Sequence, residues 1–292
     1  MRSLLFVPGD SERKLEKGRE SGADALLIDL EDSISPERKQ AAREMTLSFL
    51  KTFAQGSRRP RLFVRVNGLA SGLTDADLGV VAGRPDGIML PKAEGGASVI
   101  HLDAKLTVLE AEHDLPDGQV QILAIATETA RALFLAGTYA QASPRLIGLT
   151  WGAEDLSAEL GAEANRDADG RFLDPYRLAR SLCLAGAAAA KVQAIDTVYV
   201  DFRNEAGLRR ECEEARREGF TGKMAIHPAQ VPVINEVFTP TSAAVATARA
   251  VIAAFESNPD KGAVGIDGVM YDRPHLERAR QVLIRAKAAG VT

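Results

Sequence analysis

The stretch LLFVPGDSERKLEKGRESGADALLIDL, residues 4–30, shows the pattern that decides the fold of this chain. Two runs that are almost wholly apolar, 4–8 and 25–30, lie on either side of a charged stretch at 12–21 with helical spacing. Strands buried on both faces of a parallel sheet have such continuous runs, whereas strands with one face in water alternate apolar and polar residues. The stretch therefore predicts a strand, a helix and a second, parallel strand.

The same alternation continues along most of the chain. Helical patterns such as 35–52 and 176–191 separate the apolar runs, and Ser35-Pro36 supplies an N-cap residue and a proline at the first helical position. Eight strand–helix units in succession predict an α/β fold, the (β/α)8 TIM barrel. An open, doubly wound sheet is the alternative, although no G-x-G-x-x-G follows the first run, as its dinucleotide-binding version requires. The eight predicted strands are residues 4–8, 25–30, 61–66, 87–91, 121–126, 145–150, 197–202 and 223–226.

The barrel pattern ends before residue 239, which predicts two parts of unequal size. We expect a catalytic barrel at 1–238 and a C-terminal extension or lid at 239–292. The extension has helical patterns at 242–256 and 275–289, with a hairpin signal around Asp267-Gly268 between them.

The longest gap between predicted strands, the one before 197–202, contains the polar segment 165–171. We expect this segment in the loop at the catalytic face. Its Asp167-x-Asp169-Gly170 resembles part of a calcium-binding loop but lacks the closing glutamate, so we expect a turn.

Composition disfavours several classes of protein. The 292 residues contain 36 Lys and Arg against 40 Asp and Glu, a net charge of −4, so there is no basic surplus for a nucleic-acid backbone. The longest nearly uncharged run of small residues, 181–190, is far shorter than the ~20 residues of a membrane-spanning helix. We therefore expect neither a nucleic acid nor a membrane as partner. The chain has two cysteines without a C-x-x-C pair, and no signal-peptide pattern follows Met1, so we expect a reduced, cytoplasmic protein.

Polar residues follow most of the predicted strands at their carboxyl ends, which is where barrels carry their chemistry. Several carboxylates that meet at one barrel mouth repel one another unless a cation lies among them. A divalent cation with oxygen ligands meets this need, and Mg²⁺ commonly takes one or two carboxylates together with water and substrate oxygens. The residues at these ends are Asp29, Glu31, Asp32, Arg65, Asn67, Lys92, Glu128, Glu154, Asp155, Asp201 and His227.

Several of these residues also have an ordinary structural explanation. Asp32, Glu128 and Asp155 could each stabilise the start of the next helix, as a cap or as an acid in the first turn. Arg65 lies in an apolar strand and needs a partner, either an anionic substrate or a structural carboxylate. His227-Pro228 could be a tight turn whose imidazole bonds to backbone.

A second kind of chemistry on this fold is a Schiff-base aldolase, which needs a lysine in an apolar pocket. Lys92 after the fourth strand is the first candidate and Lys223 the second. The sequence contains no H-E-x-x-H, G-x-S-x-G or phosphate-binding-loop motif.

Seven motifs occur in order along the chain: RSLLFVPG (2–9), DLED (29–32), VRVN (64–67), LPK (90–92), ATET (126–129), GAEDL (152–156) and AIHP (225–228). This set resembles the motifs of citrate lyase β-subunit-like proteins, which belong with malyl-CoA lyases and related acyl-CoA lyases in the HpcH/HpaI aldolase superfamily. The resemblance extends from residue 2 to about residue 290, and the set is far more specific than any single motif.

The resemblance implies a TIM barrel that depends on Mg²⁺ and assembles as a homo-oligomer, a trimer or a dimer of trimers. By motif, Glu128 and Asp155 would be the metal ligands. Arg65 would hold the carboxylate and carbonyl end of an oxaloacetate- or glyoxylate-like substrate. Glu31 and Asp32 would reach the metal through water.

The C-terminal extension contributes one further residue by resemblance. Met270-Tyr271-Asp272-Arg273-Pro274 is similar to a motif whose aspartate serves as an acid/base, often over a neighbouring subunit's active site. Asp272 would therefore carry the proton. Its structural alternative is the N-cap of the last helix.

Binding of the coenzyme A thioester is a weaker implication of the resemblance. Arg13 and Lys14, at the start of the first helix, would meet the phosphates or would simply be solvated. Pro91 and Lys92 would bind substrate. In the family that this chain resembles, the lysine at the position of Lys92 does not form a Schiff base, so the resemblance disfavours that alternative.

The activity implied by the resemblance is that of a carbon–carbon oxo-acid lyase. It would cleave or form a β-hydroxy acyl thioester such as citryl- or malyl-CoA, with an acetyl thioester and a 2-oxo acid, oxaloacetate or glyoxylate, as the products of cleavage. Malate or citramalate synthase and malyl-CoA thioesterase are alternatives on the same site. The Schiff-base aldolase and a non-catalytic keto-acid-binding subunit are alternatives of another class, and the subunits of a citrate lyase complex are candidate partners.

Overall fold

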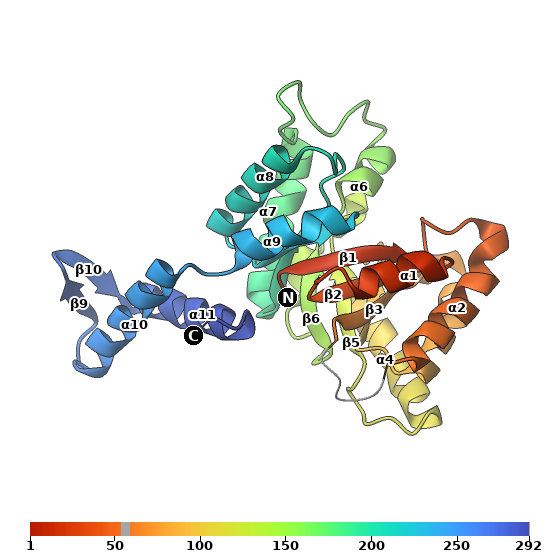
Figure 1. The fold of residues 1–292 in the computed structure, drawn as a ribbon, viewed down its shortest axis with the longest axis horizontal. Coiled ribbons are helices and arrows are strands. Elements are labelled where there is room, and N and C mark those ends of the chain that lie inside the picture. Colours follow the sequence, from red (N-terminus) through yellow and green to blue (C-terminus); the bar gives the residue numbers. More distant parts are fainter. Residues whose placement is uncertain (54–58, 292) are drawn as a thin grey trace. The chain divides into compact units, whose positions relative to one another are not determined.

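The computed structural model describes residues 1–53 and 59–291. Eight parallel strands close into a barrel in sequence order, with the last strand paired to the first (Figure 1). The predicted TIM barrel is confirmed. Its strands are β1 (Ser3–Pro8), β2 (Ala25–Asp29), β3 (Arg61–Arg65), β4 (Gly87–Leu90), β5 (Gln121–Ile125), β6 (Leu146–Thr150), β7 (Gln193–Asp196) and β8 (Gly222–Ala225).

The strands are apolar throughout because both of their faces are buried. One face fills the barrel interior with large side chains, and the other face packs under the surrounding helices. The interior cluster includes Leu4, Leu27, Phe63, Met89, Leu123, Ile195 and Met224.

Helices lie outside the strands of the barrel (Figure 1). The α-helices are α1 (Glu12–Arg19), α2 (Lys39–Lys51), α3 (Thr74–Leu78), α4 (Gly96–Glu112), α5 (Ala130–Leu133), α6 (Ala153–Leu160), α7 (Asp174–Ala190), α8 (Glu205–Glu218) and α9 (Val231–Phe238). Short 3-10 turns are η1 (Pro36–Arg38), η2 (Leu69–Ser71), η3 (Gly79–Gly83), η4 (Ala136–Tyr139) and η5 (Pro228–Gln230). Pro36 opens η1 as predicted, but Ser35 makes no side-chain cap bond there.

The prediction for the seventh strand was wrong by several residues. The strand occupies Gln193–Asp196, before the predicted run 197–202. Helix α7 ends at Ala190, and Lys191 then adopts a left-handed conformation (φ 57°), so the chain turns at once into the strand. Asp196, which resembles a polar interruption in the sequence, is instead fully buried in the strand because it pairs with Lys223 of β8.

The polar segment 165–171 lies between α6 and α7, and it forms the predicted turn. The Asp167 carboxylate accepts the backbone N–H groups of Asp169 and Arg171, each at 2.9 Å. Gly170 has a positive φ of 78°. These backbone bonds occupy Asp167 as a turn residue and not as a calcium ligand.

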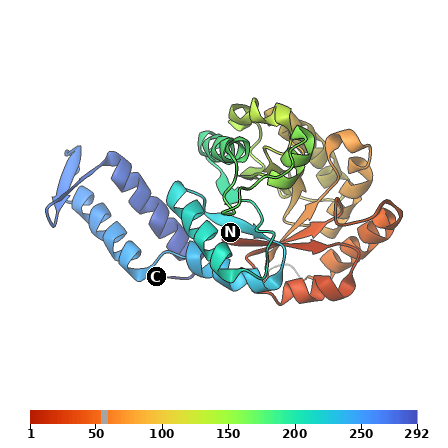
Figure 2. The same cartoon turned by 90° about the horizontal axis from the view of Figure 1, so that it is seen from above.

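By its internal contacts the chain divides into two compact units, 1–234 and 235–292. The predicted boundary at 238/239 falls slightly later, at the end of α9. The second unit contains α10 (Ser242–Glu256), the hairpin β9 (Ala263–Ile266) and β10 (Val269–Asp272), and α11 (Arg273–Ala288). Helices α10 and α11 lie side by side (Figure 2) and bury a small apolar core that includes Val251, Phe255 and Leu276.

The hairpin turn of the second unit forms where the sequence predicts it. Asp267 and Gly268 both adopt positive φ, 50° and 79°. This is the conformation that a two-residue turn between twisted strands requires.

One helical stretch among the described residues, Pro228–Glu256, is long and apolar enough to cross a membrane by length and composition alone. A single stretch of this kind is weak evidence, because core helices pass the same test. Here α9 ends at Phe238 and α10 begins at Ser242, with Pro240 in between. The apolar side of α10 packs against α11, and this packing accounts for the apolar composition of α10 without a membrane.

Candidate active site

A cavity of about 310 Å³ opens at the carboxyl ends of the strands. It brings together three predicted site residues that are far apart in the sequence, Arg65, Glu128 and Asp155. The cavity lies on the face that carries the chemistry in barrels of this kind. Its lining residues are Phe6, Pro8, Asp29, Ser33, Arg65, Ile125, Glu128, Trp151, Gly152, Ala153, Glu154, Asp155, Thr197, Val198, Met224 and Ile226.

Arg65, at the end of β3, is fixed by a structural carboxylate from the neighbouring strand. Its Nε and Nη2 donate to the two oxygens of Asp29, both at 2.7 Å, and its Nη1 lies 3.0 Å from Glu31. The guanidinium also lies 4.8 Å from the centre of the Phe6 ring. Burial alone would raise the pKa of Asp29, but the charge and hydrogen bonds of Arg65 outweigh it and hold that pKa below its usual value.

Glu128 follows β5 and is almost completely buried, at 3% exposure. Its Oε2 accepts the backbone N–H of Lys92 at 2.5 Å. Burial, together with the nearby Asp155 carboxylate, raises the pKa of Glu128 to about 8. Helix capping does not explain this residue, because Thr129 is the N-cap of α5 and accepts the N–H of Ala132.

Gly152 is required by the close approach of Glu128. A Cβ atom at position 152 would lie 2.7 Å from Cγ of Glu128, a separation that side chains do not tolerate. The GAEDL motif therefore has two functions. Its glycine leaves room for the Glu128 carboxylate, and its aspartate, Asp155, lies in the first turn of α6 beside the same cavity.

Lys92 connects the carboxylates of the site. Its Nζ lies 2.6 Å from Glu31, 3.2 Å from Asp155 and 3.6 Å from Asp32. Its backbone has a positive φ of 51°, which is uncommon outside glycine. Burial would lower the pKa of Lys92, but these carboxylates raise it well above its usual value.

Glu31 and Asp32 differ in environment although they are adjacent. Burial is the main cause that raises the pKa of Glu31 to about 7, against the opposing charges of Arg65 and Lys92. The Asp32 side chain is 54% exposed and lies 3.5 Å from Arg65. Asp32 is not the cap of the following helix, because Ser35 occupies the N-cap position of η1.

The comparisons with known proteins agree with this geometry. The family model described as HpcH/HpaI aldolase/citrate lyase matches residues 2–228. The chain belongs to this family.

Relatives of this HpcH/HpaI family member cover nearly its whole length. A (3S)-malyl-CoA thioesterase from Cereibacter sphaeroides is 38% identical over 98% of this chain and 95% of its own. The citrate lyase subunit beta from Leuconostoc mesenteroides subsp. cremoris is 35% identical over 98% of this chain and 93% of its own. A crystal structure of the protein CitE from Mycobacterium tuberculosis, in complex with magnesium, acetoacetate and coenzyme A, matches with a TM-score of 0.78 and 34% identity, over 98% of this chain and 100% of that chain.

Neither lysine considered for a Schiff base has the free amine that such chemistry needs. Lys92 is ion-paired with carboxylates, as described above. Lys223 is fully buried and donates to Asp196 at 2.8 Å and to Glu211 at 2.7 Å. The family assignment and the geometry therefore both disfavour the Schiff-base alternative.

Glu31, Asp32 and Lys92 contact the lining residues Arg65 and Asp155 without lining the cavity themselves. The remaining residues predicted for the site also lie outside the lining. Arg13 and Lys14 are exposed on α1, and Pro91 is buried beside Lys92. His227 forms the expected turn, since its Nδ1 accepts the backbone N–H of Ala229 at 3.2 Å. Asp201 is exposed in the loop after β7 and does not end a strand.

Asp272 belongs to the second unit and is the N-cap of α11, as its structural alternative proposed. Its carboxylate accepts the backbone N–H of His275 at 3.4 Å and also contacts the His275 ring. The hydrogen bond from this ring is the main cause that lowers the pKa of Asp272. The side chain remains 43% exposed, so its capping role leaves the carboxylate accessible.

Sequence reasoning missed two residues that organise the site. Asp29 was noted at the end of β2 but given no role, and it fixes Arg65. Lys39 of α2 donates to the carbonyl oxygens of Leu30 and Glu31, both at 2.7 Å, and so holds the loop that carries Glu31. No motif identifies Lys39, because its contacts depend on how α2 packs over the barrel mouth.

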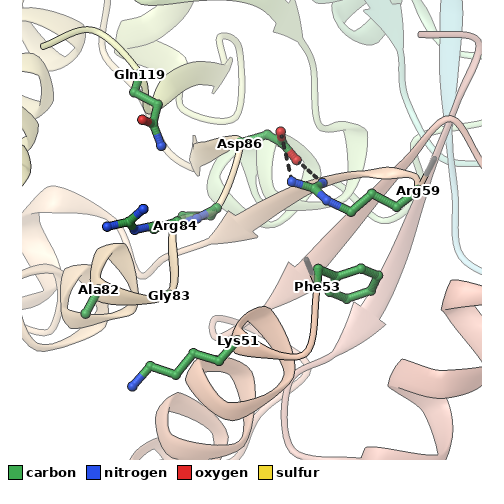
Figure 3. Close-up of a pocket in the computed structure, with 9 residues that line it drawn as sticks. Lys51, Phe53, Arg59, Ala82, Gly83, Arg84, Asp86 and Gln119 are labelled. Carbon is green, nitrogen blue, oxygen red and sulfur yellow. Dashed lines mark hydrogen bonds and ion pairs between the residues drawn. The ribbon is translucent and has the colours of Figure 1, made fainter. Parts of the chain in front are cut away.

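A second cavity, of about 580 Å³, is larger but lacks every predicted site residue (Figure 3). It lies where the chain enters the strands, because Asp86 directly precedes β4 and Gln119 lies two residues before β5. Arg59 and Asp86 form an ion pair there, with two hydrogen bonds between them. Since this end of a barrel serves stability and not chemistry, we place the active site in the smaller cavity.

Proposed function

We propose that this chain is a Mg²⁺-dependent oxo-acid lyase that cleaves or forms a β-hydroxy acyl thioester. Cleavage would give acetyl-CoA and a 2-oxo acid. The observation that carries the proposal is the convergence of Glu128, Asp155 and Arg65 on one cavity at the carboxyl ends of the strands. Membership of the aldolase/citrate lyase family supports the reaction class.

The residues present fit a magnesium ion held partly by substrate. No group of three or more His, Cys, Asp or Glu side chains that could hold a metal ion exists within residues 1–53 and 59–291. Mg²⁺ does not need such a group, because one or two carboxylates with water and substrate oxygens suffice. Glu128 and Asp155 would hold the ion, which when bound would polarise the keto-acid carbonyl as a Lewis acid.

Arg65 would orient the carboxylate end of the substrate. A guanidinium has five N–H donors, and the bonds to Asp29 use only two of them. The bidentate pair with Asp29 therefore holds the plane of the guanidinium. Nη1 is ion-paired with Glu31 at 3.0 Å, so the second N–H of Nη2 is the donor left for a substrate carboxylate. Glu31 and Asp32 would act on the metal through water.

Asp272 would carry the proton of the acetyl methyl group. In the cleavage direction its Oδ would return a proton to the enolate carbon, and in the condensation direction it would remove one. Its partial exposure leaves the carboxylate accessible for this role. We propose that it acts over the cavity of a neighbouring subunit in a homo-oligomer, a trimer or a dimer of trimers.

Coenzyme A binding rests on the start of the first helix. Arg13 and Lys14 are exposed there, in the segment that follows β1. Both side chains would be free to meet phosphates, and Pro91 and Lys92 would contact substrate at the mouth. The CitE structure with magnesium, acetoacetate and coenzyme A supports a shared site for these three kinds of ligand.

Two alternatives keep support from the relatives. The similarity to a (3S)-malyl-CoA thioesterase supports hydrolysis of the thioester, and the same site could also serve a malate or citramalate synthase. The similarity to a citrate lyase subunit beta supports a role inside a larger complex with partner subunits.

Both cysteines are free and buried, which supports a cytoplasmic location.

One experiment tests the reaction class. Purified protein is incubated with Mg²⁺ and malyl-, citramalyl- or citryl-CoA, and the products are separated by chromatography. A lyase gives acetyl-CoA and a 2-oxo acid, whereas a thioesterase gives the free β-hydroxy acid and free coenzyme A. EDTA should stop turnover and borohydride should trap no protein adduct. Turnover that persists in EDTA would overturn the proposal.

A further inference from the structure

The lining of the active-site cavity divides into a charged half and an apolar half. Every charged side chain in the described lining comes from β2, β3 or the segments that follow β5 and β6. Strands β7, β8 and β1 and the residues just after them contribute no charged group: this part of the lining consists of the apolar Val198, Met224, Ile226, Phe6 and Pro8 and one hydroxyl residue, Thr197. Since the barrel closes in sequence order, this second group forms one continuous wall.

The charged half has an excess of negative groups. Six carboxylates surround it, Asp29, Glu31, Asp32, Glu128, Glu154 and Asp155, against two cations, Arg65 and Lys92. Both cations already contact carboxylates: Arg65 is paired with Asp29, and Lys92 with Glu31 and Asp155. Arg65 is the one cation in the described lining, because Lys92 lies beside the cavity and is not among its lining residues.

The position of the carboxylate and carbonyl end of the 2-oxo acid decides which half of the cavity lining contacts the rest of the molecule. On the proposed function, the carboxylate and carbonyl oxygens face Glu128, Asp155 and Arg65. The substituent on the carbonyl carbon then extends toward the apolar wall. A second carboxylate on this substituent would lose its water there without gaining a cationic partner, which is costly.

We propose that the apolar wall selects 2-oxo acids whose substituent is a hydrogen or a small alkyl group, such as glyoxylate or pyruvate, over the dicarboxylate oxaloacetate. Val198, Met224 and Ile226 are the specificity-determining residues. The inference rests on the proposed function and goes beyond it, because the family motifs concern the shared end of the substrate and leave its substituent open. The thioester substrates are then of the malyl or citramalyl type and not of the citryl type.

Calorimetry on the full-length protein with saturating Mg²⁺ tests this selectivity. We expect glyoxylate or pyruvate to bind at least about tenfold more tightly than freshly prepared oxaloacetate. Ile226→Arg places a guanidinium on the wall, and the native side chain is 40% exposed, so the substitution is compatible with folding. It should shift the oxaloacetate-to-pyruvate affinity ratio toward oxaloacetate by about tenfold. Ile226→Leu is the matched control and should leave the ratio unchanged.

Three outcomes would overturn the inference, and they are distinguishable. Wild-type protein that binds oxaloacetate as tightly as pyruvate contradicts the selectivity alone. If Ile226→Arg increases the affinity for oxaloacetate and for pyruvate by the same factor, the effect is one of general charge. The wild-type wall then does not disfavour oxaloacetate by lacking a cationic partner for its second carboxylate. Absence of Mg²⁺-dependent binding for all three acids contradicts the proposed function itself, and the inference fails with it.

Discussion

The backbone N–H of Lys92 lies 2.5 Å from Oε2 of Glu128 and donates a hydrogen bond to it. The side chain of the same residue reaches across the site, with Nζ 3.2 Å from Asp155. One residue therefore contacts both carboxylates that we propose as metal ligands. Its left-handed backbone, with φ at 51°, aims the amide and the ammonium at different strand ends.

Glu128→Gln removes one proposed ligand charge while keeping the shape of the side chain. We expect Mg²⁺ affinity to fall by at least about 100-fold, because a neutral amide is a poor replacement for a buried carboxylate ligand. The melting temperature should not fall, since a neutral group is easier to bury. Mg²⁺ calorimetry and thermal unfolding measure the two effects. Asp201→Asn, in the exposed loop after β7, is the control. Unchanged affinity in Glu128→Gln would remove this residue from the metal site.

Arg65→Lys keeps the charge but loses the planar fork that binds Asp29. We expect the free energy of unfolding to fall by about 2 kcal/mol, because the buried Asp29 carboxylate loses paired hydrogen bonds. Keto-acid affinity should fall by about tenfold or more for the same reason. Urea unfolding and calorimetry test both. Arg38→Lys, at the exposed ion pair with Asp10, should change stability by less than about 0.5 kcal/mol. Equal effects of the two substitutions would contradict a special role for Arg65.

Lys92→Met removes the ammonium that competes with a cation for Asp155. We expect Mg²⁺ to bind more tightly, by about threefold to tenfold, because three carboxylates lose their counter-ion. Keto-acid affinity should fall, since the site becomes more negative. Lys105→Met, at the surface ion pair with Asp75, is the control. Weaker Mg²⁺ binding in Lys92→Met would show that the ammonium supports the metal site by positioning its ligands.

Acid should destabilise the barrel through Asp196. Burial alone would raise the pKa of Asp196, but Lys223 and Arg180 lower it from its usual 3.8 to about 2. A carboxyl whose pKa is lowered by folding contributes stability above its unfolded pKa and loses it as the pH falls toward its folded value. The free energy of unfolding should therefore decrease from about pH 4 to pH 2. Asp196→Asn should flatten this slope and cost about 3 kcal/mol at neutral pH, because Lys223 keeps only Glu211 as its partner. An unchanged slope in urea titrations would contradict the assignment.

Two substitutions at Asp272 separate its capping role from proton transfer. Asp272→Asn keeps a good N-cap but has no base, whereas Asp272→Ala loses both. Exchange of the acetyl-CoA methyl protons with deuterium, followed by NMR in the presence of Mg²⁺ and pyruvate, should be lost in both variants. Only the alanine variant should lose stability, because it alone lacks the side-chain cap of α11. Normal exchange in Asp272→Asn would leave Asp272 as a cap alone.

The barrel could be predicted from the sequence because strands buried on both faces leave continuous apolar runs. The error at β7 has a physical cause. An aspartate is not expected in a strand that is buried on both faces, so Asp196 seemed to exclude a strand at 193–196. Inside the fold the charge of Lys223 neutralises Asp196, and β7 therefore includes it. Patterns of single residues do not reveal such pairs across strands.

The part of the candidate site that follows directly from the strand ends could be predicted from the sequence, because the carboxyl ends of all strands meet at one end of a closed barrel. Arg65, Glu128 and Asp155 follow different strands, and closure of the barrel brings them to one cavity. The parts that were missed depend on packing. The contacts of Lys39 with the 30–31 loop, and the fixing of Arg65 by Asp29, require the helix and strand positions and have no local signal in the sequence.

The division of the cavity lining between strands also bears on how this enzyme could diverge. The proposed metal ligands and Arg65 come from the ends of β3, β5 and β6, and the wall that faces the substituent comes from β7, β8 and β1. Mutations that accumulate after β7 and β8 can therefore explore new substrates while the reaction machinery is inherited unchanged. A library confined to Val198, Met224 and Ile226 is accordingly the natural starting point for redirecting this scaffold to other keto acids.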